Sequence, residues 1–187
     1  RGIKKIDSLL SLINDLLDVA KLEAGRLVQR QVPTDVGKII EETAALMIPR
    51  AKEQGITLSY TCEHLKPVLA DPKNIEEIFN NLFSNALNYS PDGGEVRISA
   101  KMLGDFMEIK VADQGIGIPP EEMSKIFEKF YRVKDPKTRR VTGTGLGLSI
   151  VKGIVEAHRG SIDVQSVINL GTSFRVLLPA MKEEEQQ

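Results

Sequence analysis

The stretch DPKNIEEIFNNLFSNALNYS, residues 71–90, predicts an amphipathic helix on which much of the fold depends. Asp71 is a favourable N-cap residue, and Pro72 suits the first helical position because its missing N–H is not needed there. Large apolar side chains recur at helical spacing on one side: Phe79, Leu82, Phe83 and Leu87. We therefore expect this side of the helix to be buried in the core.

Three asparagines share the other face of this predicted helix. They stand at positions i, i+4 and i+7: Asn81, Asn85 and Asn88. Asparagine is a poor residue for a helix interior because its amide competes with the backbone, so three on one stripe indicate a function. One amide oxygen together with phosphates and waters is a typical way to hold Mg²⁺. A solvent-exposed polar face is the alternative interpretation.

Two glycine-rich stretches follow in the sequence. Gly115 and Gly117 come after a predicted strand that ends at Asp113, and VTGTGLGLSIVKG, residues 141–153, precedes an apolar helix. The N-terminal amides of such a helix can face an anion. Neither stretch fits the G-x-G-x-x-G fingerprint of a Rossmann fold, and the P-loop pattern is absent. Taken alone, the glycines are also compatible with a purely structural role.

The remaining segments predict further helices and hairpins. Helices are expected over 34–55, 119–130 and from the second glycine stretch to about His158. Strands are expected over 56–62, over 68–70 and in two hairpins, 94–103 with 106–113 and 160–166 with 171–179. Residues 132–142 lack periodicity and predict a mobile loop. This mixture predicts an α+β fold, a two-layer α/β sandwich whose mixed, mainly antiparallel sheet is covered by helices on one face.

Residues 1–30 predict a long N-terminal helix with an apolar seam. Its apolar residues alternate at spacings of three and four: Ile3, Ile6, Leu10, Ile13, Leu17, Ala20, Ala24 and Leu27. Such a seam needs a partner helix, either in an intersubunit bundle or, as the alternative, on its own domain. We expect a globular domain over 31–182 and a disordered tail over 183–187.

Composition excludes several classes of function. The 187 residues are 41% hydrophobic, which is enough for one core. Because 25 Lys and Arg are balanced by 26 Asp and Glu, the chain lacks the net positive charge typical of a nucleic-acid binder. Cys62 is the single cysteine, so an internal disulfide is excluded, and with only His64 and His158 beside it the chain offers no zinc cluster. No apolar stretch reaches the roughly 18 residues of a membrane span.

Four motifs, in this order, resemble those of the ATP-binding catalytic domain of sensor histidine kinases. NNLFSNALNYS resembles the N box, DQGIGIP the first glycine box, FEKFYR the F box and GTGLGLS the second glycine box. That domain belongs to the superfamily shared with gyrase, the Hsp90 chaperone and MutL. The stretch LLSLINDLLDVAKLEAG resembles the second helix of the family's dimerisation hairpin, so the resemblance extends from about residue 3 to 180.

The resemblance implies a role for each residue that matches a motif. Asn85 would bind Mg²⁺, Asp113 would accept the adenine amino group, and Tyr89 would lie against the base. Asn81 stands where hydrolysing relatives have a Glu that activates water, and it is the candidate catalytic residue. The nucleotide-binding set implied in this way comprises Asn85, Asn88, Tyr89, Asp113, Gly115, Gly117, Ile118, Tyr131, Arg132, Thr144, Gly145, Leu146, Gly147, Leu148 and Thr172.

The chain departs from the family pattern in two respects. Asn88 stands where the family often has Lys, so a neutral amide meets a phosphate charge. Four cations of the predicted lid are candidate substitutes: Lys134, Lys137, Arg139 and Arg140. No histidine lies in a pattern like the phosphoacceptor box, since His64 falls in a loop and His158 at a helix end suited to capping or packing. We expect the phosphoacceptor to precede Arg1, on a helix that this chain lacks.

The sequence thus predicts the ATP-binding catalytic domain of a two-component sensor histidine kinase, with ATP and Mg²⁺ as cofactors. It would transfer the γ-phosphoryl group to a His on an acceptor helix absent from the chain, and the isolated chain should lack autophosphorylation. The expected partners are a second copy through the hairpin helix, the acceptor helix and a response regulator, with no nucleic acid. We expect a cytoplasmic location, with membrane contact only through missing segments.

Two alternatives to the kinase remain at this point. A degenerate nucleotide-sensing interaction module without kinase activity is the first, and Asn88 is its best support in the sequence. The second is a Rossmann oxidoreductase, which the glycine spacing disfavours. Labelling of a separately supplied acceptor helix would distinguish the kinase from the module, and binding of NAD without ATP would favour the oxidoreductase.

Overall fold

The computed structural model describes residues 12–13, 16–17, 19–20, 31–133, 136–138 and 143–182. Most of the predicted N-terminal helix, the predicted tail 183–187 and the lid residues Lys134, Arg139 and Arg140 lie outside the described residues, as does the side chain of Lys137. The six described residues before position 31 are all helical. Three of them, Ile13, Leu17 and Ala20, belong to the predicted seam, and all three are exposed.

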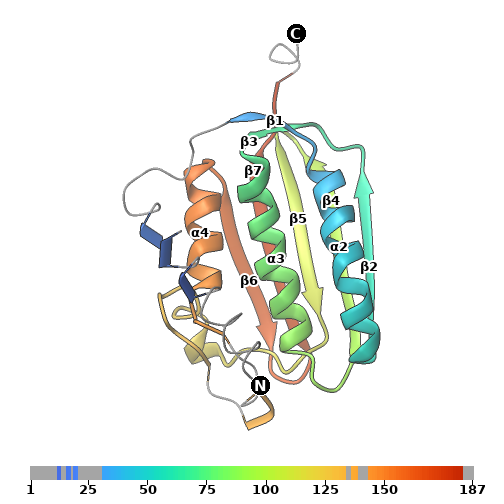
Figure 1. The fold of residues 1–187 in the computed structure, drawn as a ribbon, viewed down its shortest axis with the longest axis vertical. Coiled ribbons are helices and arrows are strands. Elements are labelled where there is room, and N and C mark those ends of the chain that lie inside the picture. The colour runs from blue at the N-terminus through green and yellow to red at the C-terminus, as the bar shows by residue number, and fades with distance from the viewer. Residues whose placement is uncertain are drawn as a thin grey trace.

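A five-stranded sheet forms one layer of the molecule, in the order β2-β4-β5-β7-β6 (Figure 1). Its strands are β2 (Ile56–Glu63), β4 (Gly94–Leu103), β5 (Phe106–Asp113), β6 (Ser161–Val167) and β7 (Gly171–Pro179). β2 pairs with β4 in parallel, and the other three pairings are antiparallel. Both predicted hairpins are confirmed, and so is a mixed, mainly antiparallel sheet.

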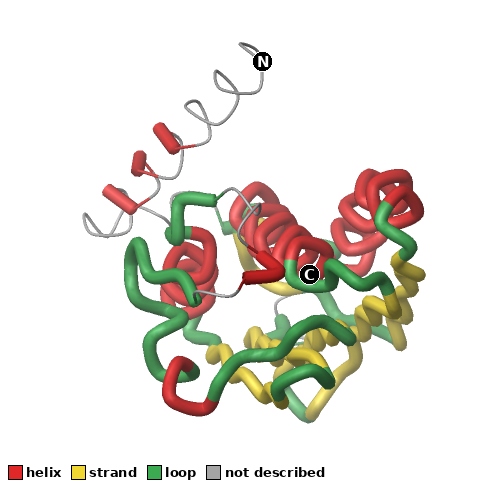
Figure 2. Tube along the Cα trace, turned by 90° about the horizontal axis from the view of Figure 1, so that it is seen from below, coloured by secondary structure: helices red, strands yellow, loops and turns green. Residues whose placement is uncertain are grey.

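Three helices form the second layer and cover one face of the sheet (Figure 2). They are α2 (Val36–Glu53), α3 (Pro72–Asn88) and α4 (Gly147–Ala157), with α3 between the other two (Figure 1). The predicted two-layer α+β sandwich is therefore confirmed. None of the helices in the described ranges has both the length and the apolarity that crossing a bilayer would take.

α3 is the centre of the core, and its sequence explains why. The Asp71 side chain caps the helix by accepting a hydrogen bond from the backbone N–H of Lys73 at 3.0 Å, and Pro72 follows at the first position. Phe79 and Phe83 are fully buried and stack with their ring centroids 5.5 Å apart. Burial of such side chains, each stabilising by roughly 1.5–3 kcal/mol, fixes which face of α3 points outward.

The structure differs from the sequence prediction in two places. A short strand β1 (Val32–Thr34) was not predicted, because three residues with a central proline give no period; it pairs antiparallel with β3 (Val68–Ala70) in a separate two-stranded sheet. The predicted helix over 119–130 is wrong. Only a 3₁₀ turn, η1 (Pro120–Glu122), forms there, followed by turns closed by bonds between residues three apart.

Tertiary packing explains this second difference. Ile126 is 6% exposed within the core, and Phe127 meets Phe174 of β7 edge to face with centroids 6.4 Å apart. Burial of Ile126 in the core and packing of Phe127 against the sheet determine the local backbone against its helix propensity. A second 3₁₀ turn, η2 (Pro136–Thr138), lies in the segment predicted as a loop.

Candidate functional site

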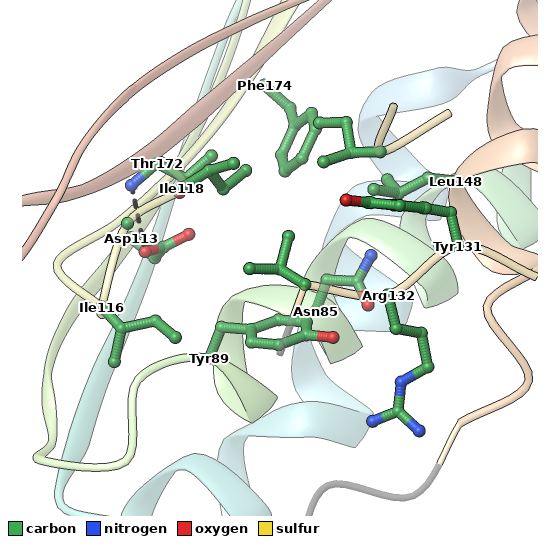
Figure 3. Close-up of a pocket in the computed structure, with 13 residues that line it drawn as sticks. Asn85, Tyr89, Asp113, Ile116, Ile118, Tyr131, Arg132, Leu148, Thr172 and Phe174 are labelled. Atoms are coloured by element: carbon green, nitrogen blue, oxygen red, sulfur yellow. Dashed lines mark hydrogen bonds between the residues drawn. The ribbon is translucent and has the colours of Figure 1, made fainter. Parts of the chain in front are cut away.

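A cleft opens where the end of α3, the end of β5 and the start of α4 meet (Figure 3). Asp113 and Thr172 lie on one side of it, and Tyr131 and Arg132 lie on the other. Nine of the predicted nucleotide-binding residues line it: Asn85, Tyr89, Asp113, Gly117, Ile118, Tyr131, Arg132, Leu148 and Thr172. Segments that are as much as 89 positions apart in the sequence, from Asn85 to Phe174, thus contribute to one site.

The three asparagines of α3 have different environments. The Asn81 side chain donates a hydrogen bond to the backbone carbonyl of Glu77 at 3.0 Å. Asn88 accepts at Oδ1 from Arg50 Nη2 at 2.5 Å and donates through Nδ2 to Ser84 Oγ at 3.3 Å, and it is not among the residues that line the cleft. The Asn85 amide lines the cleft and has no hydrogen-bond partner in the part of the chain that is described.

Asn85 is therefore the asparagine whose amide is available to a ligand in the cleft. Among the described residues, no three His, Cys, Asp or Glu side chains are grouped so that they could hold a metal ion. A magnesium ion in the cleft would accordingly take one oxygen from Asn85 and the rest from phosphates and waters. The donor set fits Mg²⁺, which keeps several waters and prefers oxygen ligands.

Asp113 is held at the end of β5 by backbone donors. Its Oδ1 accepts hydrogen bonds from the N–H of Gly115 at 2.8 Å and the N–H of Thr172 at 3.2 Å. Burial raises the pKa of this carboxyl from 3.8 to about 6, although the two backbone hydrogen bonds lower it. Because Oδ1 is occupied, Oδ2 is the oxygen that can accept a hydrogen bond from a ligand.

A hydroxyl network supports this side of the cleft. Ser166 Oγ donates to the carbonyl of Gly171 at 2.9 Å and accepts from the N–H of Ile118 at 2.8 Å. Since a serine has one hydroxyl proton, the contact of 2.9 Å between Ser166 Oγ and Thr172 Oγ1 requires Thr172 to donate. The lone pairs of Thr172 Oγ1 then remain for a donor in the cleft. Ser166 was not identified from the sequence, where no motif marks it.

Gly115 allows the loop after β5 to touch the end of α3. A Cβ at this position would overlap the carbonyl oxygen of Tyr89. That same oxygen accepts a hydrogen bond from the N–H of Ile116 at 3.0 Å. Gly115 does not line the cleft itself, but its close approach fixes Tyr89 and Asp113 as neighbouring parts of the wall.

The second glycine stretch brings the start of α4 against α3. A Cβ at Gly147 would overlap Oδ1 of Asn81, so the predicted catalytic residue lies beside the first turn of α4 rather than in the lining of the cleft. No side chain of the described residues caps α4, whose N-cap residue is Leu146. Its first amides are therefore not covered by a capping side chain, as binding of an anion would require.

Hydrogen bonds hold the segment before α4 in place. The N–H of Phe130 donates to the carbonyl of Gly145 at 3.0 Å, and Thr144 Oγ1 accepts from the N–H of Leu146 at 3.2 Å. Arg132, which is exposed, donates to the carbonyl of Gly143 at 3.1 Å. Four predicted residues of this stretch, Thr144, Gly145, Leu146 and Gly147, border the site without lining the cleft.

Sequence reasoning missed part of the apolar wall of the cleft. Four further residues line the cleft: Ile116, Ile126, Val133 and Phe174. Ile116 lies between two of the predicted glycines, and Ile126 and Val133 directly flank FEKFYR, so their place next to the motifs was a usable signal. Phe174 belongs to the inward side of β7 and was indistinguishable from any core residue. The histidines lie as predicted, His64 in the loop after β2 and His158 buried at the C-cap of α4.

Comparison with known families gives a match over residues 70–182 to the model described as histidine kinase-, DNA gyrase B-, and HSP90-like ATPase. A sensor-like histidine kinase of Rhizobium meliloti is 35% identical over 173 residues, covering 92% of this chain and 33% of that protein. The sensor histidine kinase WalK of Bacillus subtilis is 34% identical over 185 residues, covering 96% of this chain and 30% of WalK. The chain thus spans about a third of the length of these relatives.

Among solved structures, full-length ShkA in complex with AMPPNP superposes with a TM-score of 0.83 at 32% identity. The match covers 96% of this chain and 37% of that one. The histidine kinase AdeS of Acinetobacter baumannii gives a TM-score of 0.80 at 23% identity, covering 96% of this chain and 82% of AdeS, which supports the fold.

Proposed function

The chain belongs to the histidine kinase-, DNA gyrase B-, and HSP90-like ATPase family and is the ATP-binding catalytic domain of a sensor histidine kinase, and from this premise we propose that it transfers the γ-phosphoryl group of ATP to a histidine outside the chain. The observation that carries the proposal is the pairing of Asp113 and Asn85 in one cleft. Asp113 offers a fixed carboxylate oxygen, and Asn85 offers an amide that has no hydrogen-bond partner among the described residues. The similar protein ShkA was solved with the nucleotide AMPPNP, which supports the same use of the cleft here.

The base of the nucleotide would lie beside Asp113. The amino group of adenine is a donor, and Oδ2 of Asp113 is an acceptor whose orientation is fixed through the two bonds to Oδ1. Tyr89 and Ile118 would contact the faces and edges of the base. A guanine, which presents a carbonyl oxygen at the corresponding position, would leave the carboxylate facing another acceptor.

The phosphates would extend toward Asn85 and the first turn of α4. Mg²⁺, held by the Asn85 amide oxygen, would neutralise part of the phosphate charge when bound. The uncapped amides at the start of α4 would donate to phosphate oxygens, and the exposed guanidinium of Arg132 could add charge from the other side. These groups position the γ-phosphoryl group for in-line transfer, which is how most of the rate arises in this chemistry.

Asn81 supports transfer rather than hydrolysis. A neutral amide cannot act as a strong general base toward water, and the amide nitrogen is already committed to the carbonyl of Glu77. A neutral imidazole, by contrast, already offers a lone pair to phosphorus and needs no base to generate one. We therefore propose slow ATP hydrolysis and transfer to histidine, with Asn81 orienting neighbouring groups at the start of α4.

The partners are proposed from the same relatives. Sensor histidine kinases as a class support a homodimer through the hairpin helix, an acceptor-histidine helix and a response regulator as partners of the whole protein. Exposure of the seam residues Ile13 and Leu17, at 46% and 53%, supports a helical partner at that face. We place the domain in the cytoplasm, where its substrate ATP is available.

The proposal is tested by calorimetric titration of the chain with ADP and ATP, with and without Mg²⁺. Binding of both nucleotides with enhancement by Mg²⁺ is expected, and absence of binding would contradict the proposal. Transfer is then tested by supplying a separate acceptor helix with labelled ATP. Label on the histidine supports the kinase, whereas nucleotide binding without label would leave a nucleotide-sensing module.

A further inference from the structure

Arg50 links α2 to the wall of the nucleotide cleft. It lies in the last turn of α2 and is half-buried, and its Nη2 donates to Oδ1 of Asn88 on α3 at 2.5 Å. Within the described part of the chain, no carboxylate forms an ion pair with Arg50. A half-buried guanidinium with an amide for its partner keeps most of its charge unneutralised.

Helix-dipole stabilisation alone does not explain this contact. A cation in the last turn of a helix is favourable, and both Arg50 and Lys52 occupy the last turn of α2. Lys52 is exposed and has no described contact with α3, whereas Arg50 reaches across to a particular amide. The contact therefore has a second role that Lys52 does not share.

The position of Asn88 indicates what that role is. Asn88 follows Asn85 by one helical turn and directly precedes Tyr89. Asn85 and Tyr89 both line the cleft. Because residues three apart on a helix are separated by about 5–6 Å, the Arg50 charge lies close to the amide proposed to hold Mg²⁺. This is the side of the cleft on which the polyphosphate would lie.

The hydrogen bond also fixes which way the Asn88 amide faces. With Oδ1 accepting from Arg50, the NH₂ group of Asn88 is turned away, and one of its protons is directed to Ser84 Oγ at 3.3 Å. The amide has a second N–H, which can donate to an anion. Donation from a cation to Oδ1 also polarises the amide and strengthens its own donors.

We propose that Arg50 is a positioning residue for the polyphosphate of the bound nucleotide. It acts through Asn88, whose amide it orients as a donor, and adds positive charge at the phosphate side of the cleft. In this chain a neutral asparagine and a cation from the neighbouring helix together perform the task of a single cationic side chain. This inference rests on the proposed function, because it presupposes that a nucleoside di- or triphosphate occupies the cleft.

The experiment compares Arg50→Met, Arg50→Lys and the matched control Lys52→Met, which removes the other cation of the same helical turn. Affinities for ATP, ADP and adenosine are measured by titration, and thermal unfolding verifies that each variant is folded. Arg50→Met should weaken ADP binding roughly fivefold, and ATP binding at least as much, while adenosine binding is unchanged. Arg50→Lys should keep more ADP affinity than Arg50→Met, and Lys52→Met should match the wild type.

A double variant tests whether Arg50 acts through Asn88. In the Asn88→Ala background, Arg50→Met should have a smaller effect on ADP affinity than in the wild type, and an undiminished effect would contradict the coupling. Equal losses for ADP and adenosine, or an equal loss in Lys52→Met, would also overturn the inference. If the wild type binds no nucleotide, the proposed function fails as well; if it binds and Arg50→Met binds ADP equally, only this inference fails.

Discussion

Acidification should weaken adenine nucleotide binding through Asp113. The carboxyl has its pKa raised to about 6 by burial, so it is ionised at neutral pH and takes up a proton in mildly acidic solution. At about pH 5 a group with this pKa is roughly 90% protonated, and at about pH 7.5 it is almost fully ionised. If only the ionised form accepts the amino group of adenine well, the affinity for ADP should fall about tenfold over this range.

Acidification should have the opposite effect on the stability of the free protein, which should rise as the pH falls. The pKa of Asp113 is raised from 3.8 to about 6 in the folded state, so the folded state holds the proton more tightly than the unfolded state. The desolvated carboxylate therefore destabilises the fold above pH 6 by about 3 kcal/mol, and this cost is relieved as the pH falls from 6 toward 3.8. Nucleotide stabilises the ionised form, so the thermal shift produced by ADP should shrink as the pH is lowered.

The assay is titration with ADP at several values between about pH 7.5 and pH 5, with Asp113→Asn as the matched control. Phosphate groups of the nucleotide also titrate in this range, and Asp113→Asn retains that contribution while losing the carboxyl. We expect the variant to bind ADP more weakly at neutral pH by about 1–3 kcal/mol, because a polar contact is lost, and to show a flatter pH profile. Parallel profiles for the wild type and the variant would refute the role given to Asp113.

Three further predictions concern the metal site, the wall of the cleft and the core. Asn85→Ala should abolish the enhancement of ATP binding by Mg²⁺ while leaving binding without Mg²⁺ nearly unchanged, and an enhancement that persists in the titration would remove Asn85 from the metal site. Gly115→Ala should destabilise the fold by about 1–3 kcal/mol, because the added methyl overlaps the Tyr89 carbonyl. Gly143→Ala, where an added Cβ meets open space, is its control in thermal unfolding. Leu82→Ala, at a position 1% exposed, should lower the free energy of unfolding by about 2–5 kcal/mol in denaturant titrations, and a loss below about 1 kcal/mol would contradict its place in the core.

Local signals account for what the sequence predicted well. The signals for α3 all lie within a few helical turns of one another: the cap at Asp71, the proline after it and the apolar spacing. The observed helix runs from Pro72 to Asn88. The hairpins were likewise predictable because the turn residues lie directly between the two strands that pair. The segment after Pro119 was predicted wrongly because its backbone is determined by tertiary packing: Ile126 is buried in the core, and Phe127 contacts Phe174 of the distant strand β7.

The candidate site was predictable as a set of motifs but not as a set of contacts. Sequence spacing placed three asparagines on one face of α3, yet only the structure distinguishes them, because α2 and α4 flank that helix on different sides (Figure 1). Arg50 engages Asn88, and the start of α4 meets Asn81, which leaves Asn85 available in the cleft. Contacts between separate elements have no signature within either element, so neither Arg50 on α2 nor Ser166 on β6 could be identified from the sequence.

The two sides of the cleft are held by different kinds of contact, and this difference affects how the nucleotide is recognised. Asp113 is held by backbone N–H groups at the ends of two sheet strands, and its neighbour Thr172 is fixed by Ser166. No rearrangement of the segment before α4 is needed to orient that carboxylate, so selection of the base should be complete before the phosphates are engaged. In the binding mode proposed here, the phosphate side instead depends on Asn85, on the start of α4 and on the Arg50 and Asn88 pair. Discrimination between adenine and guanine should therefore persist in nucleosides that lack phosphates, whereas the preference for ATP over adenosine should depend on the helices.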